Sequence, residues 1–352
     1  MGSPDITPGI IIGKLEAPQE TIASQRPDED QASRVNILGQ LHGITPEQIR
    51  NFKEAIPLAN YYNGVDPVIM LDLAAGTGFV AEQIAQHAID TGIPVTMHTI
   101  EINHAMNAVA RARIESFLGV DPSRRDLFSM LAHDGDITTQ GGIERLAKLR
   151  EASVDIVSIK MGLHEMPMAN KRELLKDVYR VLKPGGRLVS WDVFVPERTN
   201  GTPAIEYTRF IAEKDRIAGR GSMAIRREFH TKGELKRLLT QAGFNQEMIS
   251  MSQYSWVRTW DTIERWFFEL GNENPSNLIR LNQAATDYIG RYDESMLGDS
   301  AFTGTLREYM DLHYTNGGFD GTGIDPILAD RQYVVTGYSF EIGSGISIAI
   351  KK

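Results

Sequence analysis

From Pro67 to Phe194 short apolar runs alternate with longer segments that show helical spacing of apolar residues. This alternation predicts a parallel sheet with helices on both faces. Before each new parallel strand the chain must cross back, usually through a helix, to the edge of the sheet where the previous strand began. We therefore expect a doubly wound α/β domain. Its expected strands are residues 68–73, 94–100, 127–132, 154–160 and 187–194, and the helices between them are 78–91, 104–118, 142–150 and 171–182.

Segments on both sides of this alternation predict further elements. Residues 1–66 are expected to form an N-terminal arm and a helical lid, with helices at 28–42 and 45–55. The core is assigned to residues 67–253, an inserted cap for acceptor binding to 254–335, and the strand or strands that complete the sheet to 336–352. The other elements expected are helices at 204–217, 231–242, 278–291 and 305–313, and strands at 246–252, 333–342 and 346–350.

Composition excludes several classes of function. The chain has no cysteine, which excludes disulfides, thiolate metal sites and thiol nucleophiles. Its 37 basic and 46 acidic residues give a net charge of −9, which repels phosphate backbones, so we expect no nucleic-acid partner. No apolar run approaches the roughly 18 residues of a membrane span. The N-terminus lacks the pattern of a secretory signal, so a cytoplasmic location is expected, and no metal-ligand set is recognisable.

The most informative motif is Asp72-Leu73-Ala74-Ala75-Gly76-Thr77-Gly78, which ends a predicted strand and opens a predicted helix. Small residues at Ala74, Gly76 and Gly78 let backbone amides approach a ligand, and the first turn of a helix offers unpaired N–H groups. Residues 76–81 also fit the dinucleotide pattern G-x-G-x-x-A, which leaves an NAD-dependent enzyme open. The carboxylate of Asp72 instead suits a ligand with a cationic amino-acid end.

Acidic residues also follow the next two predicted strands. Glu101, followed by Ile102, stands where a carboxylate can accept hydrogen bonds from both ribose hydroxyls. Asp134 and Asp136 stand where an acid can accept from the exocyclic amine of adenine. The alternatives are a solvated strand-end glutamate for Glu101 and a plain turn for the aspartates.

Together these residues resemble the class I S-adenosylmethionine-dependent methyltransferases, especially the small-molecule branch that includes the ubiquinone and menaquinone C-methyltransferases. The resemblance covers about residues 68–244 and extends to two later landmarks, Leu182-Lys183-Pro184-Gly185-Gly186 and Gln241-Ala242-Gly243-Phe244. It implies a seven-stranded, mostly parallel Rossmann-like sheet with helical cap elements from both termini. It also implies S-adenosyl-L-methionine as cofactor, bound by the acidic and small residues named above and by Lys160 and Met161 at the methionine end.

The stretch Met161-Gly162-Leu163-His164-Glu165-Met166-Pro167 resembles the family segment that faces the methyl acceptor. His164 has an ordinary pKa suited to a general base, and Glu165 could orient it or bind a cationic acceptor. The alternative is that His164 only packs beneath the cofactor loop. Acceptor specificity is expected from residues outside the common core, namely Tyr61, Tyr62, Trp191 and Trp256.

We therefore predict methyl transfer from S-adenosylmethionine to the carbon, oxygen or nitrogen of a small, apolar or aromatic metabolite, in a chain that could form a homodimer. Two alternatives remain at this point. One is an NAD-dependent oxidoreductase that uses Gly76 to Ala81, and the other is a protein that binds S-adenosylmethionine without methylating, such as a cyclase or a regulatory binder.

Overall fold

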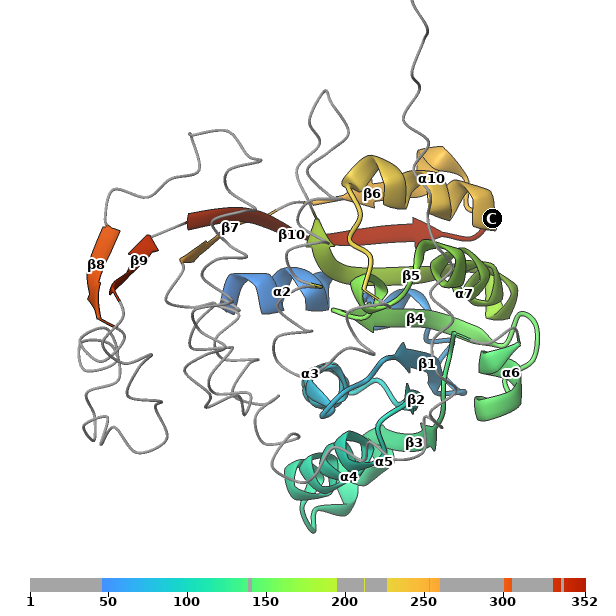
Figure 1. Ribbon diagram of the computed structural model, residues 1–352. Coiled ribbons are helices and arrows are strands. Elements are labelled where there is room, and N and C mark those ends of the chain that lie inside the picture. Colours follow the sequence, from blue (N-terminus) through green and yellow to red (C-terminus); the bar gives the residue numbers. More distant parts are fainter. Residues whose placement is uncertain are drawn as a thin grey trace, which may run out of the picture.

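The computed structural model describes residues 46–138, 141–194, 212, 227–252, 254–259, 301–305, 332–336 and 339–352 (Figure 1). The predicted helices at 28–42 and 278–291, and residues 306–313 of another, lie outside the described residues. Of the predicted helix 204–217 only Ala212 is described, and it is helical and buried.

A single large sheet organises the fold, in the strand order β3-β2-β1-β4-β5-β10-β6 (Figure 1). The first five strands pair in parallel: β1 (Val68–Leu73), β2 (Val95–Glu101), β3 (Phe128–Asp134), β4 (Val154–Lys160) and β5 (Leu182–Phe194). The long β10 (Ser339–Ile350) pairs antiparallel with β5, with β6 (Ile249–Met251) and with β7 (Tyr254–Thr259). The predicted doubly wound, mostly parallel sheet is confirmed, with β7 as an eighth strand beside the seven of the main path.

Helices cover both faces of this sheet because side chains alternate in direction along each strand. Leu71 and Leu73 of β1 belong to the core cluster that packs against the helices of one face, and Val68 and Met70 belong to the cluster of the other face. The first face carries α6 (Gly142–Ala147), α7 (Met168–Val181) and α10 (Lys232–Ala242); the second carries α2 (Pro46–Glu54), α3 (Phe79–Thr91) and α4 (His104–Leu118).

Several element boundaries differ from the prediction. The predicted strand at 246–252 is a 3₁₀ turn, η4 (Gln246–Met248), followed by the short β6, because Asn245 caps the turn by accepting from the amide of Glu247. A short helix that was not predicted, α5 (Pro122–Leu127), begins at the side chain of Asp121, which accepts from the amide of Ser123.

The C-terminal strands are also arranged differently from the prediction. The predicted strand at 333–342 is divided: β9 (Gln332–Thr336) pairs with β8 (Ala301–Thr305), and β10 runs without interruption from Ser339. Thr305, the predicted start of a helix, ends β8. The other elements are the 3₁₀ turns η2 (Leu58–Asn60) and η3 (Leu163–Glu165).

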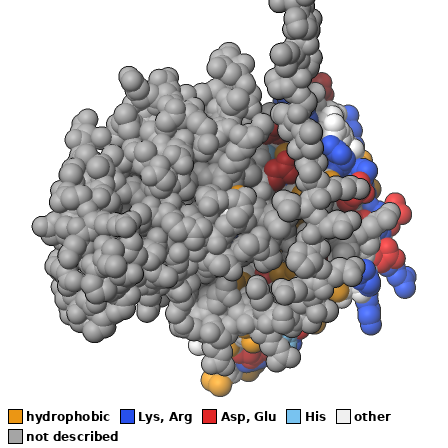
Figure 2. Space-filling view, in the orientation of Figure 1, with side chains coloured by type: hydrophobic (Ala, Val, Ile, Leu, Met, Phe, Trp, Pro, Cys, Tyr) orange, Lys and Arg blue, Asp and Glu red, His pale blue; other side chains and the backbone are white. Residues whose placement is uncertain are grey.

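The surface beside α6 and α7 carries charges of both signs. Arg180 of α7 pairs with Glu144 of α6 at 3.2 Å, and Lys176 pairs with Glu173 at 2.9 Å. In the space-filling view, basic and acidic side chains lie side by side over this part of the described surface (Figure 2).

Candidate active site

The loop after β1 has an unusual backbone conformation that suits the close approach of a ligand. Ala74, Gly76 and Gly78 have φ of +54°, +56° and +81°, a region that side chains disfavour. Among the described residues, a Cβ on Gly76 would meet no atom within 4 Å beyond its chain neighbours, whereas one on Gly78 would lie 2.9 Å from the Cβ of Ala110 in α4. Gly78 thus permits the packing of α3 on α4, and Gly76 leaves open space beside the loop.

Glu101 connects this loop to the end of β2. One carboxylate oxygen accepts from the amide of Gly76 at 2.8 Å, and the other accepts from the amide of Asn103 at 2.9 Å. Burial raises the pKa of Glu101, while these backbone amides act in the opposite direction. Each oxygen has further lone pairs, so the same carboxylate can accept from hydroxyl groups of a ligand.

Asp72 and Lys160 lie beneath the loop at the ends of β1 and β4. The carboxylate of Asp72 is buried and accepts from the hydroxyl of Ser158 at 2.7 Å, and its second oxygen has no partner among the described residues. Burial raises the pKa of Asp72 to about 7 and lowers the pKa of Lys160 to about 8. The Lys160 ammonium lies 4.9 Å from the ring centre of Phe79. An unpartnered buried carboxylate oxygen at this position fits a ligand that brings a cationic or hydrogen-bonding group.

Met161, the residue after Lys160, has a φ of +55°, and its amide donates to the carbonyl of Trp191 at 2.7 Å. Strained backbone of this kind is characteristic of functional sites. The next residue, Gly162, lies against Ala74, because a Cβ on Gly162 would be 2.8 Å from the Cβ of Ala74. The loops after β1 and β4 are therefore in contact.

The acidic residues after β3 have separate local roles. Asp134 accepts from the amide side chain of Asn107 at 2.7 Å and pairs with the His104 ring at 3.0 Å, which ties it to the start of α4. Asp136 accepts from both the amide and the hydroxyl of Thr138. At the end of β2 the side chain of Ile102 is 52% exposed and offers an apolar surface beside these residues.

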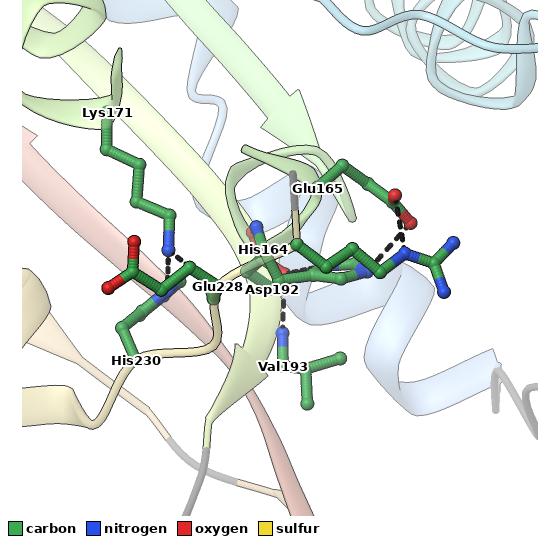
Figure 3. Close-up of polar contacts among 8 residues, drawn as sticks. His164, Glu165, Lys171, Asp192, Val193, Glu228 and His230 are labelled. Carbon is green, nitrogen blue, oxygen red and sulfur yellow. Dashed lines mark hydrogen bonds and ion pairs between the residues drawn. The ribbon is translucent and has the colours of Figure 1, made fainter. Parts of the chain in front are cut away.

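His164, in η3, is held between two carboxylates (Figure 3). Its Nδ1 lies 2.5 Å from Asp192 at the end of β5, and its Nε2 lies 3.2 Å from Glu165. Burial acts to lower the pKa of His164, but the Asp192 and Glu165 carboxylates outweigh it and raise that pKa to about 9. The ring is therefore an imidazolium at neutral pH in this arrangement. Asp192 itself is fully buried, and its pKa is held low by the charge of His164 despite burial.

Residues 227–230, which are distant in sequence from η3, pack beside His164 and its two carboxylates. Arg227 donates to Glu165 at 2.7 Å, and the ring of Phe229 stacks on the ring of His164 with centroids 5.2 Å apart. Lys171 of α7 is fully buried, donates to the carbonyl of Glu228 and lies 3.2 Å from the ring of His230. Burial lowers the pKa of Lys171 to about 8 and that of His230 to about 3. The sequence analysis did not identify these residues as parts of the site.

The tyrosine and tryptophan residues predicted to contact an acceptor do not all reach this edge of the sheet. The Tyr61 hydroxyl donates to the carbonyl of Gly185 and accepts from Arg187, and both partners lie near the start of β5, at the other end of the sheet. Tyr61 is thus engaged away from the loops after β1 and β4, and Tyr62 packs with it against the same core cluster.

Trp191 is 2% exposed and packs with its ring centre 5.6 Å from that of Phe52 in α2. Its ring also lies 5.4 Å from the ammonium of Lys160, so Trp191 supports a residue of the crevice from within the core. Trp256 lies in β7 opposite Ile342, but its side chain lies outside what the structure describes.

Among the described residues, no group of three or more histidine, aspartate or glutamate side chains is arranged to hold a metal ion. None of the helices in the described part of the chain is long and apolar enough to cross a membrane.

Comparison with known proteins agrees with this architecture. Residues 71–190 match the family model described as a methyltransferase domain. The chain is 28% identical to the ubiquinone/menaquinone biosynthesis C-methyltransferase of Hydrogenovibrio crunogenus over 197 residues, which cover 53% of this chain and 69% of the relative. It is 26% identical to the enzyme of the same name from Pseudoalteromonas translucida over 186 residues, which cover 50% of this chain and 66% of the relative.

A solved structure shares the fold. A Bacillus halodurans protein described as a methyltransferase superposes with a TM-score of 0.52 at 19% identity, covering 85% of this chain and 99% of that one.

The matches to the two C-methyltransferases span about two thirds of the length of those relatives.

Proposed function

We propose, from the premise that this chain carries a class I S-adenosylmethionine-dependent methyltransferase domain, that it methylates a small, apolar or aromatic metabolite and that His164 acts on the acceptor. The observation that carries the proposal is the adjacency of two features. The glycine-containing loop and the Glu101 carboxylate form one end of the site, and the His164–Asp192 pair follows the neighbouring β4 and β5.

The residues present fit the cofactor by their chemistry. Glu101 would accept from the ribose hydroxyls, and Ile102 with Asp134 and Asp136 would lie near adenine. Asp72, Ala74, Lys160 and Met161 would surround the amino-acid end, where the unpartnered oxygen of Asp72 can accept from an ammonium group. Gly76 and Gly78 would allow the loop to lie close to the cofactor.

Bound S-adenosylmethionine supplies a methyl group already activated on a sulfonium. The chain therefore has to position the acceptor in line with that methyl group and keep water away, and proximity of this kind supplies much of the acceleration. A base is needed only where the nucleophile carries a proton when bound. His164 is suited to take that proton at Nε2, because Asp192 fixes Nδ1 and the orientation of the ring. Nε2 must then exchange its contact with Glu165 for the acceptor.

The protonation of His164 gives a testable pH dependence. Since its pKa is raised to about 9, the neutral imidazole is a minor form at neutral pH. If it is the base, the rate of methyl transfer should rise about tenfold per pH unit between about pH 6 and 8 and level off near pH 9. His164→Gln should remove this rise. The measurement is transfer of a labelled methyl group to a panel of phenols and hydroquinones. A wild-type rate that does not change across this range would exclude the base role.

Glu101 gives a test of cofactor binding that does not require the acceptor. Glu101→Gln should weaken binding of S-adenosylhomocysteine at least tenfold, about 1.4 kcal/mol, because one oxygen becomes an N–H donor facing backbone amides or ribose hydroxyls. Titration calorimetry measures this directly. Glu115→Gln, on the exposed side of α4, is the matched control and should bind like wild type. Equal affinities for both variants would contradict the role of Glu101.

The finer features of the function remain predictions. Methylation of carbon, oxygen or nitrogen, a homodimer and a cytoplasmic location each follow from the sequence or from the family resemblance. An NAD-dependent reaction is not favoured, since the matching family model and relatives are methyltransferases.

A further inference from the structure

We propose that Arg227 is a positioning residue for His164: it holds the Glu165 carboxylate against Nε2 of the ring and so fixes the orientation and charge of the imidazole. This inference rests on the proposed function only for its relevance to catalysis. The contacts among Arg227, Glu165 and His164 do not depend on that function.

Arg227, Glu165, His164 and Asp192 form a continuous chain of contacts, of which Figure 3 labels Glu165, His164 and Asp192. Arg227 Nε donates to one oxygen of Glu165 at 2.7 Å, and the other oxygen of Glu165 lies 3.2 Å from His164 Nε2. On the opposite side of the ring, Asp192 lies 2.5 Å from Nδ1. Glu165 thus uses its two oxygens on two different cations. Among the described residues, Arg227 is the cation that binds one oxygen and so keeps the other turned toward the ring.

The segment that carries Arg227 is fixed independently of this ion pair. The amide of Glu228 donates to the carbonyl of His164 at 3.1 Å, and the Glu228 carboxylate accepts from the amide of Met168 at 2.5 Å. Lys171 donates to the carbonyl of Glu228. Because the backbone is held at several points, the Arg227 side chain starts from a defined position and little further ordering is needed to hold Glu165.

Within the described residues, charged groups on several elements act on His164 or on its two carboxylates. Asp192 from β5 and Glu165 from η3 favour the charged ring, whereas the cations of Arg227, of Lys171 in α7 and of Lys160 in β4, with the ring of His230, surround these carboxylates. The Glu165 side chain is 34% exposed, so a released carboxylate can turn into water, whereas Asp192 is fully buried and cannot. Glu165 is therefore the carboxylate whose position depends on a partner.

This arrangement gives two opposite expectations for removal of Arg227. If Arg227 acted only as a nearby cation, its loss would raise the pKa of His164, since a positive charge disappears from the surroundings of an imidazolium. If Arg227 positions Glu165, its loss releases that carboxylate, and the pKa of His164 falls as it does when Glu165 itself is neutralised. The sign of the change therefore separates positioning from simple electrostatic proximity.

The experiment is an NMR titration of ¹³C-labelled histidine rings in the full chain, with the His164 signal assigned from His164→Gln. Wild type should titrate near pH 9. Arg227→Gln and Glu165→Gln should both lower the pKa of His164 by about one unit or more, as expected for the loss of a carboxylate at this distance. Arg227→Lys, which keeps a cation in place, should restore part of the wild-type value. Arg125→Gln, an exposed ion-pair residue, is the control and should change nothing.

A rise or no change in the Arg227→Gln protein would overturn the proposal. Should that variant fold poorly by circular dichroism, Glu165→Asp takes its place, because it withdraws the carboxylate from His164 and leaves Arg227 intact. That variant must then lower the pKa of His164, and an unchanged value would also overturn the proposal. The titration needs neither cofactor nor acceptor, so its failure is distinct from failure of the proposed methyl transfer.

Discussion

Asp192→Asn is expected to destabilise the protein by about 3 kcal/mol near pH 6 and to lower the pKa of His164 from about 9 to below its ordinary value. Asp192 is fully buried, and its carboxylate is the shortest contact of the His164 ring. Without it, the ring remains buried, with Glu165 as its remaining counter-charge among the described residues. Stability is lost because removing one partner of a buried ion pair leaves the charge of the other partner buried without that counter-charge.

The same pair predicts how this effect depends on pH. The folded protein binds the His164 proton more tightly than the unfolded chain, because the pKa rises from 6.5 to about 9 on folding. The stability contributed by the pair is therefore fully present below about pH 6.5 and is lost as the pH rises through about 9. Urea unfolding of wild type and Asp192→Asn near pH 6 and near pH 9.5 measures this difference.

Glu173→Gln is the matched control for the substitution of an acid by its amide, since Glu173 is exposed and pairs with Lys176 of its own helix. It should change the free energy of unfolding by about 0.5 kcal/mol or less. A difference between Asp192→Asn and wild type that is the same at both pH values would contradict the assignment of His164 as a buried imidazolium.

Gly78→Ala is expected to destabilise the fold by about 2 to 4 kcal/mol, whereas Gly76→Ala should cost only about 1 to 2. Both glycines have positive φ, so both substitutions strain the backbone. Only at Gly78 does the new Cβ also come within 2.9 Å of Ala110, and α3 or α4 must shift to admit it. Thermal or denaturant unfolding of the two variants compares these costs directly.

The two glycine variants should also differ in their affinity for the cofactor product. The methyl group of Gly76→Ala points where no protein atom lies within 4 Å, so we expect it to weaken S-adenosylhomocysteine binding more than its modest effect on stability suggests. Equal stabilities of the two variants would contradict the account of Gly78 as a packing residue, and unchanged affinity in Gly76→Ala would place the ligand away from the loop.

The parallel core could be predicted from the sequence because its signals are local. The predicted ranges of the strands at 68–73 and 154–160 agree with β1 and β4, since each is rich in apolar residues and almost wholly buried. The start of β5 was placed five residues too late because Pro184 and Gly185 indicate a turn, and the structure accommodates this turn as an irregularity in the pairing with β4. The continuous β10 could not be foreseen, because the close approach of Gly345 to Ser252 depends on tertiary pairing.

The residues of the candidate site likewise fall into two groups, those that a local sequence motif indicates and those that distant segments contribute. The turn with Gly76 and the strand-end Glu101 were identified because motif and position are adjacent in the chain. Arg227 is 62 residues from Glu165, and Asp192 is 28 residues from His164, so their contacts follow from the folding of separate segments. Tyr61 was predicted to contact the acceptor, but the sequence around it does not indicate which end of the sheet its side chain contacts. Its hydroxyl bonds to Gly185 and Arg187 near the start of β5. A run of Arg227-Glu228-Phe229-His230 before a helix cap was the available signal, but it resembles an ordinary charged loop.

The most direct test of the central claim is titration calorimetry of the wild-type chain with S-adenosylhomocysteine and, separately, with NADH. We expect saturable heat with the sulfur nucleoside at one site per chain, and no heat with the nicotinamide. Tight association with NADH and none with S-adenosylhomocysteine would show that the loop at the end of β1 serves a different cofactor.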